Sequence, residues 1–198
     1  MPSKSTAEIK HWKTVFFVIL AVKFFFLLSF QSNPQEMYFH PFIKHFLRSF
    51  DNPWDYFYKH DPSMRFPYPP LLLYIHAFFF WPYLAMGSAG MFWENFFFKL
   101  PLLGADCLIF FVLNRLFPNR FKEVLLFYFA SPVIIYVCFV YFQFDLLAVA
   151  FLCLAIYLLV RGQLHRSALV FGLSMSVKFP AVAALPLILI YIVKNFSF

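Results

Sequence analysis

Long apolar runs separated by short polar segments dominate the pattern of the chain. The four clearest runs approach the roughly 20 residues that cross the hydrocarbon core of a bilayer, and they cover residues 14–30, 96–113, 124–141 and 146–160. The pattern predicts an all-α integral membrane protein, a polytopic helix bundle that forms one membrane domain over residues 1–198. Transmembrane helices are expected at about 14–30, 96–117, 123–141, 144–161, 167–177 and 181–194.

Residues 68–98 leave two topologies open. The stretch "PYPPLLLYIHAFFFWPYLAMG" begins with three prolines, which suit the start of a helix, and a second apolar segment follows it. Because the helix over 96–117 is expected to run inward, residues 68–98 either cross the membrane twice or form a re-entrant hairpin.

Residues 31–67 form a long polar loop after the first helix. Within it, "HPFIKHFLRSF" repeats apolar residues at helical spacing, which is typical of a helix that lies on a membrane surface. Long loops with structure of their own are usually functional. We therefore expect a first extracytoplasmic loop that contains juxtamembrane helices.

Composition and charge support a membrane protein and set its sidedness. The chain is 63% hydrophobic and only 13% charged, outside the range of soluble domains. Its net charge of +7 resides in the N-terminal segment, two turns and the C-terminal end, at Lys4, Lys10, Lys13, Arg115, Arg120, Lys122, Arg161, Arg166 and Lys194, against Glu8 and Glu123. By the positive-inside rule the N-terminus is cytoplasmic. The rest of the chain is neutral, which excludes a nucleic-acid-binding surface. The positive-inside rule fixes the sidedness and not the organelle, so the endoplasmic reticulum and the plasma membrane are both open as locations.

Several polar residues interrupt the apolar runs. A charge at membrane depth costs about 2.5–3.5 kcal/mol on insertion scales, so such residues usually line a polar cavity. The chain carries six on the expected outer side, namely Glu36, Lys99, Asp106, Gln143, Asp145 and Lys178. Each alone could be a snorkelling or ion-paired residue, but together they favour a site, in which we expect Glu36, Asp145 and Lys178 to cluster.

Lys178 lies at a predicted break between two helices. Phe179 and Pro180 follow it, and proline disfavours helical continuation. The preceding helix, about 167–177, is too short to cross a bilayer, so the turn at Lys178 is expected to be recessed. Broken helices at this depth occur where the backbone faces protein or a water-filled cavity.

Five segments together resemble the membrane module of GT-C glycosyltransferases over about residues 14–194. They are "PQEMYFHPF", "FPYPPLLLY", "KLPLLGADCLIFFVLNRLF", "SPVIIYVCFVYFQFDLLAVAFLCLAIYLL" and "GLSMSVKFPAVAALPL", in that order. This superfamily includes protein O-mannosyltransferases and other transferases that use dolichol-phosphate sugars. The resemblance implies transfer of a sugar, with mannose as one candidate, from a polyprenyl-phosphate carrier on the extracytoplasmic or lumenal side.

The resemblance also implies roles for individual residues. Glu36 takes the position of the acidic residue that acts as catalytic base, and Lys178 that of the lysine that meets the lipid phosphate. Tyr68, Pro69 and Pro70 match the helix start that walls the site. Asp145 and Asp106 are expected to hold Lys178 or Lys99, to bind sugar hydroxyls or to coordinate a divalent cation. Lys99 and Gln143 are further substrate-binding candidates, and no cofactor is certain.

The implied partners are a lipid-linked sugar donor, the bilayer and a membrane protein partner. Family members continue with further helices beyond this module, so a truncated fragment or a non-catalytic membrane subunit is an alternative. A small transporter that uses Asp145, Asp106 and Lys178 as an ion path is less favoured, because the sequence shows no inverted repeat.

Overall fold

The structure is a computed structural model that describes residues 4–63, 66–87 and 90–196, and all regular structure in these residues is helical. The all-α class predicted from the sequence is therefore confirmed. In chain order the elements are α1 (Lys4–Ser29), η1 (Gln35–Phe39), α2 (His40–Ser49), α3 (Pro53–His60), α4 (Pro70–Ala85), α5 (Met91–Leu116), α6 (Phe121–Glu123), η2 (Val124–Phe129), α7 (Pro132–Ile135), η3 (Tyr136–Val140), α8 (Asp145–Val160), α9 (Leu164–Val177), η4 (Phe179–Ala184) and α10 (Leu185–Asn195).

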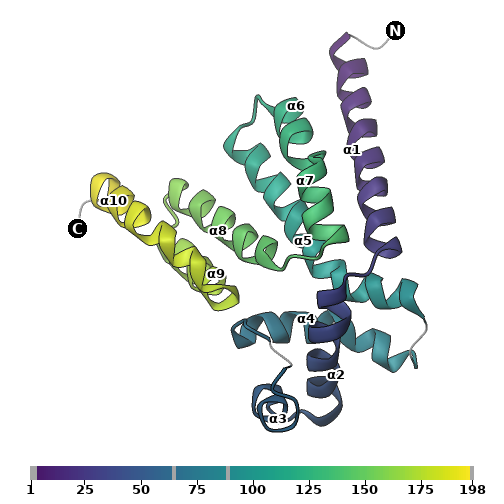
Figure 1. Cartoon of the computed structure of the whole chain (residues 1–198). Helices are drawn as coiled ribbons and strands as arrows, with labels where there is room; N and C mark the ends of the chain where they lie inside the picture. The colour runs from purple at the N-terminus through teal and green to yellow at the C-terminus, as the bar shows by residue number, and fades with distance from the viewer. Residues whose placement is uncertain (1–3, 64–65, 88–89, 197–198) are drawn as a thin grey trace.

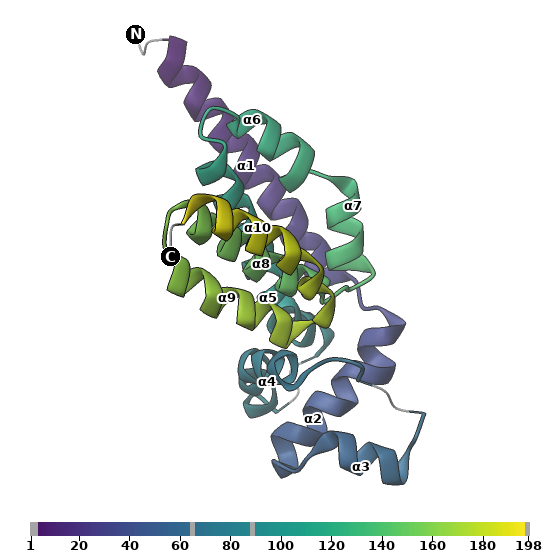
Figure 2. The same ribbon diagram turned by 90° about the vertical axis from the view of Figure 1, so that its left-hand side faces the viewer.

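The helices form a bundle with a smaller layer at one end. In Figure 1, α1, α5, α7, α8, α9 and α10 make the upper bundle, and α2, α3 and α4 lie below it. Helix α4 runs across the view in Figure 1 and is seen nearly end-on in Figure 2, so it lies crosswise to the long helices. The lower layer is built largely from the predicted polar loop and its surface helices.

Among the described residues, two helical segments are long and apolar enough to cross a membrane by length and composition, His11–Ser29 and Met91–Leu116. A third span is formed if Phe121–Phe129 and Pro132–Val140 count as one bent segment. Shorter apolar helices cover Pro70–Ala85, Asp145–Val160 and Phe179–Asn195. The protein is thus a helical membrane protein with fewer full-length spans than the apolar runs suggest.

The helix expected over about 123–141 is instead bent by 45° near residue 131. Ser131 has an extended backbone, with φ −58° and ψ 122°, and Pro132 begins α7. Proline disfavours a helical conformation in the residue before it and cannot donate a hydrogen bond to the preceding turn. These two effects account for the break, which a count of apolar residues does not reveal.

Residues 68–98 form a helical hairpin. Helix α4 begins at Pro70, and the chain turns near Gly87 and Gly90, both with positive φ, before α5 begins. The two arms pack through aromatic side chains, since the rings of His76 and Phe80 lie 5.1 and 5.4 Å from that of Phe98. The second arm continues into the bundle as α5, which begins at Met91 rather than near residue 96.

The core lies where the lower layer meets the bundle. Phe39, Phe98, Phe142 and Phe144 are all buried there, and their rings lie against one another, with 4.5 Å between the centroids of Phe39 and Phe144. These residues come from η1, α5 and the turn before α8. The core therefore fixes the position of η1, which carries Glu36, relative to the start of α8, which carries Asp145.

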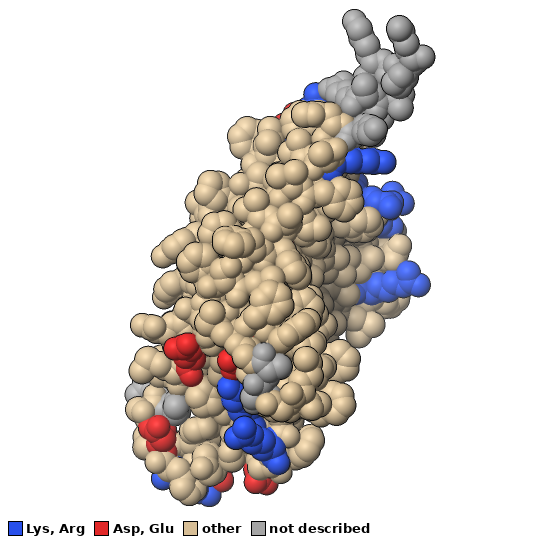
Figure 3. Space-filling view, turned by 90° about the vertical axis from the view of Figure 1, so that its right-hand side faces the viewer, with Lys and Arg blue, Asp and Glu red and all other residues tan. Residues whose placement is uncertain are grey.

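Charged side chains gather at the two ends of the molecule. Figure 3 shows a broad surface with few charged side chains between a mainly basic end near the N-terminus and an opposite end with both acidic and basic residues. Exposed basic residues of the first end include Lys13, Arg115, Arg120 and Lys122. The side chains of Lys4, Glu8 and Lys10 lie outside the described part of the structure.

Candidate active site

Asp145, Lys178 and Tyr68 come together at the lower end of the bundle. Helix α8 begins at Asp145, and α9 ends at Val177 so that Lys178 is extended before η4. The Lys178 ammonium donates a hydrogen bond to Asp145 Oδ1 and lies 5.6 Å from the centre of the Tyr68 ring. The predicted helix break thus brings one lysine to the first residue of a neighbouring helix.

Tyr68 is half-buried among aromatic rings. The ring centroids of Phe144 and Phe66 lie 5.3 and 5.5 Å from its own. Burial, together with the nearby charge of Asp145, raises the pKa of Tyr68 to about 12. The phenol therefore keeps its proton at neutral pH and can donate a hydrogen bond to an anionic ligand.

An apolar cavity of about 620 Å³ lies beside this group. It is formed by the start of α4 and the end of α9, and Pro69, Leu173 and Phe179 are among its lining residues. Pro69 follows Tyr68 and Phe179 follows Lys178 in the chain. The residues that follow Tyr68 and Lys178 thus line an apolar cavity large enough to hold part of a lipid.

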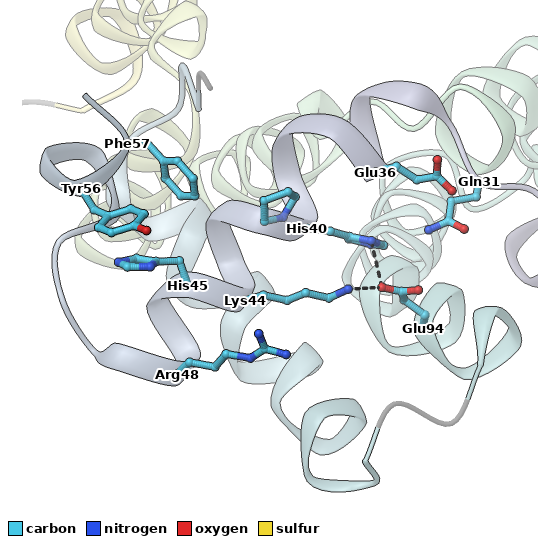
Figure 4. A pocket seen from close by; sticks show the side chains of 10 residues that line it. Gln31, Glu36, His40, Lys44, His45, Arg48, Tyr56, Phe57 and Glu94 are labelled. Atoms are coloured by element: carbon cyan, nitrogen blue, oxygen red, sulfur yellow. Dashed lines mark hydrogen bonds and ion pairs between the residues drawn. The ribbon is translucent and has the colours of Figure 1, made fainter. Parts of the chain in front are cut away.

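Glu36 lies in a different cavity. It is exposed on η1 and lines a space of about 580 Å³ between η1, α2, α3 and the start of α5. Figure 4 shows Glu36 beside Gln31 at one end of this cavity, with Tyr56 and His45 at the other. The cavity is lined by Gln31, Glu36, His40, Pro41, Lys44, His45, Arg48, Tyr56, Phe57 and Glu94.

A hydrogen-bond network holds η1 against α5 beneath this cavity. Glu94 accepts from Lys44 at 2.7 Å and from His40 Nδ1 at 3.1 Å. The Gln35 amide nitrogen lies 2.9 Å from Asn95 Oδ1 and 3.1 Å from His40 Nε2. Because an amide nitrogen can only donate, His40 Nε2 accepts and Nδ1 carries the hydrogen.

Burial lowers the pKa of His40 despite the neighbouring Glu94. The imidazole is therefore neutral at neutral pH, which matches its tautomer in the network. In this network His40 links Gln35 to Glu94.

Glu36 and the Asp145–Lys178 pair face different sides of η1. Glu36 and His40 line the cavity just described, whereas Phe39 packs on the other side against Phe144, the residue before Asp145. The structure thus joins Tyr68, Asp145 and Lys178 and places Glu36 in a neighbouring cavity.

Asp106 and Lys99 make contacts other than those expected. Asp106 is fully buried and pairs with Lys23 at 2.5 Å, not with Lys178 or Lys99. Lys99 is also fully buried, and its ammonium donates to the carbonyl oxygens of Phe30 and Phe139. Both residues face inward between α1, α5 and η3, where they hold helices together.

Gln143 lies in the turn between η3 and α8, half-buried, and its backbone N–H donates to Val137 O at 3.0 Å. It is two residues from Asp145 and shares the turn that positions the start of α8. In the described part of the chain, no group of three or more His, Cys, Asp or Glu side chains could hold a metal ion.

Sequence reasoning missed His40, Lys44, Glu94 and Lys23 as partners in these networks. For Lys23 a signal existed, because a lysine and an aspartate in two different predicted spans are best satisfied by each other. For Glu94 no comparable signal existed, since its partners lie on a helix some 50 residues earlier in the chain.

Residues 42–194 match the model of the MptA_B family, which is described as alpha-(1->6)-mannopyranosyltransferase, N-terminal domain. The chain belongs to this family. The glycosyltransferase resemblance of the sequence motifs is thereby confirmed. The MptA_B match includes Tyr68, Asp145 and Lys178 but begins after Glu36. No curated protein and no solved structure matches the chain.

Proposed function

We propose that the chain transfers a hexose, mannose by its family, from a polyprenyl-phosphate carrier to an acceptor on the extracytoplasmic or lumenal side of a membrane. The observation that carries this proposal is the Lys178–Asp145 pair beside Tyr68, at the edge of an apolar cavity. A lipid-linked sugar phosphate combines the two chemistries found there, an anionic group and an apolar chain.

Lys178 and Tyr68 are suited to the departing phosphate. When the bond between the anomeric carbon and the phosphate oxygen breaks, its electrons pass to the phosphate, whose negative charge increases. A lysine ammonium and a phenol O–H in a partly water-excluded site stabilise that charge in the transition state. Asp145 holds the ammonium in place, and Lys178 retains two further N–H donors for the ligand.

Glu36 is suited to the acceptor. A base within about 2.6–3.2 Å of a hydroxyl can take its proton while the oxygen bonds to the anomeric carbon. Glu36 is exposed to a cavity and lies on η1, which Phe39 anchors beside the start of α8. Transfer would therefore require the anomeric carbon of a donor held at Lys178 to meet the acceptor hydroxyl at Glu36 beside η1.

The sidedness of the charges supports an extracytoplasmic site. Four segments lie toward the upper part of Figure 1, away from α2 and α3. They are the N-terminal end of α1, the turn between α5 and α6, the turn between α8 and α9, and the end of α10. These segments carry the excess of Lys and Arg that is typical of cytoplasmic loops. The candidate site lies at the opposite end.

Transfer of radiolabelled mannose from a panel of polyprenyl-phosphate mannoses by the purified chain tests the proposal. We expect Glu36→Gln to lower kcat by about 10²–10⁴-fold, the range for loss of general base catalysis. Lys178→Gln should also reduce turnover. Lys59→Gln is the matched control, because Lys59 is exposed and pairs with Asp55 on α3.

Unchanged turnover in Glu36→Gln would remove Glu36 as the base. Absence of transfer by the wild-type chain with every carrier would contradict the proposal and favour a non-catalytic subunit.

A further inference from the structure

The cavity that contains Glu36 has a balanced set of charges. Its described lining residues include two cations, Lys44 and Arg48, and two carboxylates, Glu36 and Glu94. Lys44 is already bound to Glu94 at 2.7 Å, which leaves Arg48 and Glu36 for a ligand. A charged ligand of either sign would face one of these two groups with a like charge, so the cavity is better suited to a polar ligand without net charge.

The far wall of the cavity is a stack of aromatic rings. The ring of Tyr56 lies between those of His45 and His60, with centroid separations of 3.9 and 4.5 Å and interplanar angles of 20°. Asn52 caps the N-terminus of α3, because its Oδ1 accepts a hydrogen bond from the backbone N–H of Trp54 at 3.0 Å. The Tyr56 ring is held on α3 by its stacking on the two histidine rings.

The remaining groups in the cavity are both donors and acceptors. The Arg48 guanidinium donates, the Glu36 carboxylate accepts, and the Tyr56 hydroxyl and the Gln31 amide do both. Figure 4 shows Tyr56 and Glu36 at opposite ends, with Arg48 directed into the space between. A ligand rich in hydroxyl groups matches this alternation, and the volume of about 580 Å³ is in the range of small-molecule sites, roughly 300–1,000 Å³.

We propose that this cavity is a binding site for an uncharged carbohydrate, with Tyr56 and Arg48 holding a sugar unit remote from Glu36. The inference rests on the proposed function, in which it is the acceptor site. Contacts to a remote unit would position the reacting hydroxyl at Glu36 and contribute binding free energy away from the reacting atoms.

Binding of neutral disaccharides to the full chain in detergent, without donor, tests this site. The probes are α-(1→6)-mannobiose and maltose, titrated by calorimetry. We expect Tyr56→Phe to weaken binding about five- to tenfold, because it removes one hydrogen bond and leaves the ring stack intact. Tyr58→Phe is the matched control, since Tyr58 lies on the same helix, is 79% exposed and lines a different cavity.

A second pair of variants tests the guanidinium. Arg48→Gln should weaken binding about tenfold, whereas Arg161→Gln, at the opposite end of the molecule, should leave it unchanged. An excess of inorganic phosphate should not displace the disaccharide.

Three results would overturn the inference: no binding of either disaccharide, equal binding by the Tyr56→Phe and Tyr58→Phe variants, or displacement by phosphate, which would make the cavity an anion site. The outcome is separable from that of the transfer assay. Sugar binding without transfer would refute the proposed function alone. Transfer with an acceptor KM that is unchanged in Tyr56→Phe would refute the carbohydrate site alone.

Discussion

Lys23 and Asp106 are opposite charges that are both fully buried in the bundle. Lys23 lies on α1 and Asp106 on α5, and the ammonium also lies 3.8 Å from the centre of the Phe129 ring on η2. Removing two charges from water is costly, and only close pairing offsets the cost. One ion pair therefore joins α1 to α5 and lies against η2.

We predict that Lys23→Met and Asp106→Leu, made singly, each destabilise the protein by about 3–5 kcal/mol, because each leaves one charge buried without its partner. The double variant should recover most of the loss. Thermal unfolding in detergent, followed by tryptophan fluorescence, measures both effects. Single variants that are as stable as the double variant would show that the pair does not couple α1 to α5.

The packing of α8 against α9 is organised by small residues seven positions apart. Ser167 Oγ donates to Ala155 O at 2.8 Å, and Ser174 Oγ donates to Ala148 O at 2.7 Å. All four residues are buried. Small side chains let two helices approach closely, and serine hydroxyls bridge them where the surroundings are apolar. This contact positions the end of α9, and with it Lys178, beside the start of α8.

We expect Ser174→Ala to destabilise the protein by about 0.6–1.7 kcal/mol, the range measured for hydrogen bonds between membrane helices. Ser176→Ala is the control on the same helix, because the exposed Ser176 hydroxyl bonds only to Gly172 O within α9. Denaturant unfolding of both variants gives the comparison. A larger effect of Ser176→Ala would contradict the assigned role of the α8–α9 contact.

In the whole molecule, charged side chains are concentrated at two opposite ends. The surface between the two ends carries few charged side chains (Figure 3) and corresponds to the region expected within the bilayer. The polar layer of α2 and α3 and the basic turns lie at opposite ends (Figure 1), as alternation of helices across a membrane requires.

Cysteine labelling in sealed membrane vesicles with the cytoplasmic face outward measures this sidedness for either membrane. In a background with Cys107, Cys138 and Cys153 replaced by alanine, Gln163→Cys, in the turn between α8 and α9, should react with a membrane-impermeant reagent added outside. Ser63→Cys after α3 should react only after permeabilisation. Both positions are exposed, so accessibility within the fold does not bias the result. Labelling of both from the same side would contradict the topology.

The amino-acid sequence by itself determined the class of protein, the break at Lys178 and the family. These properties depend on composition and on local backbone chemistry. Apolar runs determine where the membrane helices lie. Proline determines where helices begin, at Pro70, at Pro132 and next to Pro180. The bend at Ser131 was within reach of the same reasoning, because it follows from the proline after it.

Only the tertiary structure decided which polar residues meet. Helices α1, α5 and α8 do not separate apolar and polar residues onto opposite faces, so their sequences carry no amphipathic stripe to show which face points inward. The rotation of each helix about its axis follows from packing, and this rotation pairs Asp106 with Lys23 and Asp145 with Lys178. It also turns Glu36 toward the α2–α3 cavity while Phe39 faces the start of α8. Glu36 and the Asp145–Lys178 pair thus lie in two neighbouring places because η1, with a buried aromatic side chain on one side, separates them.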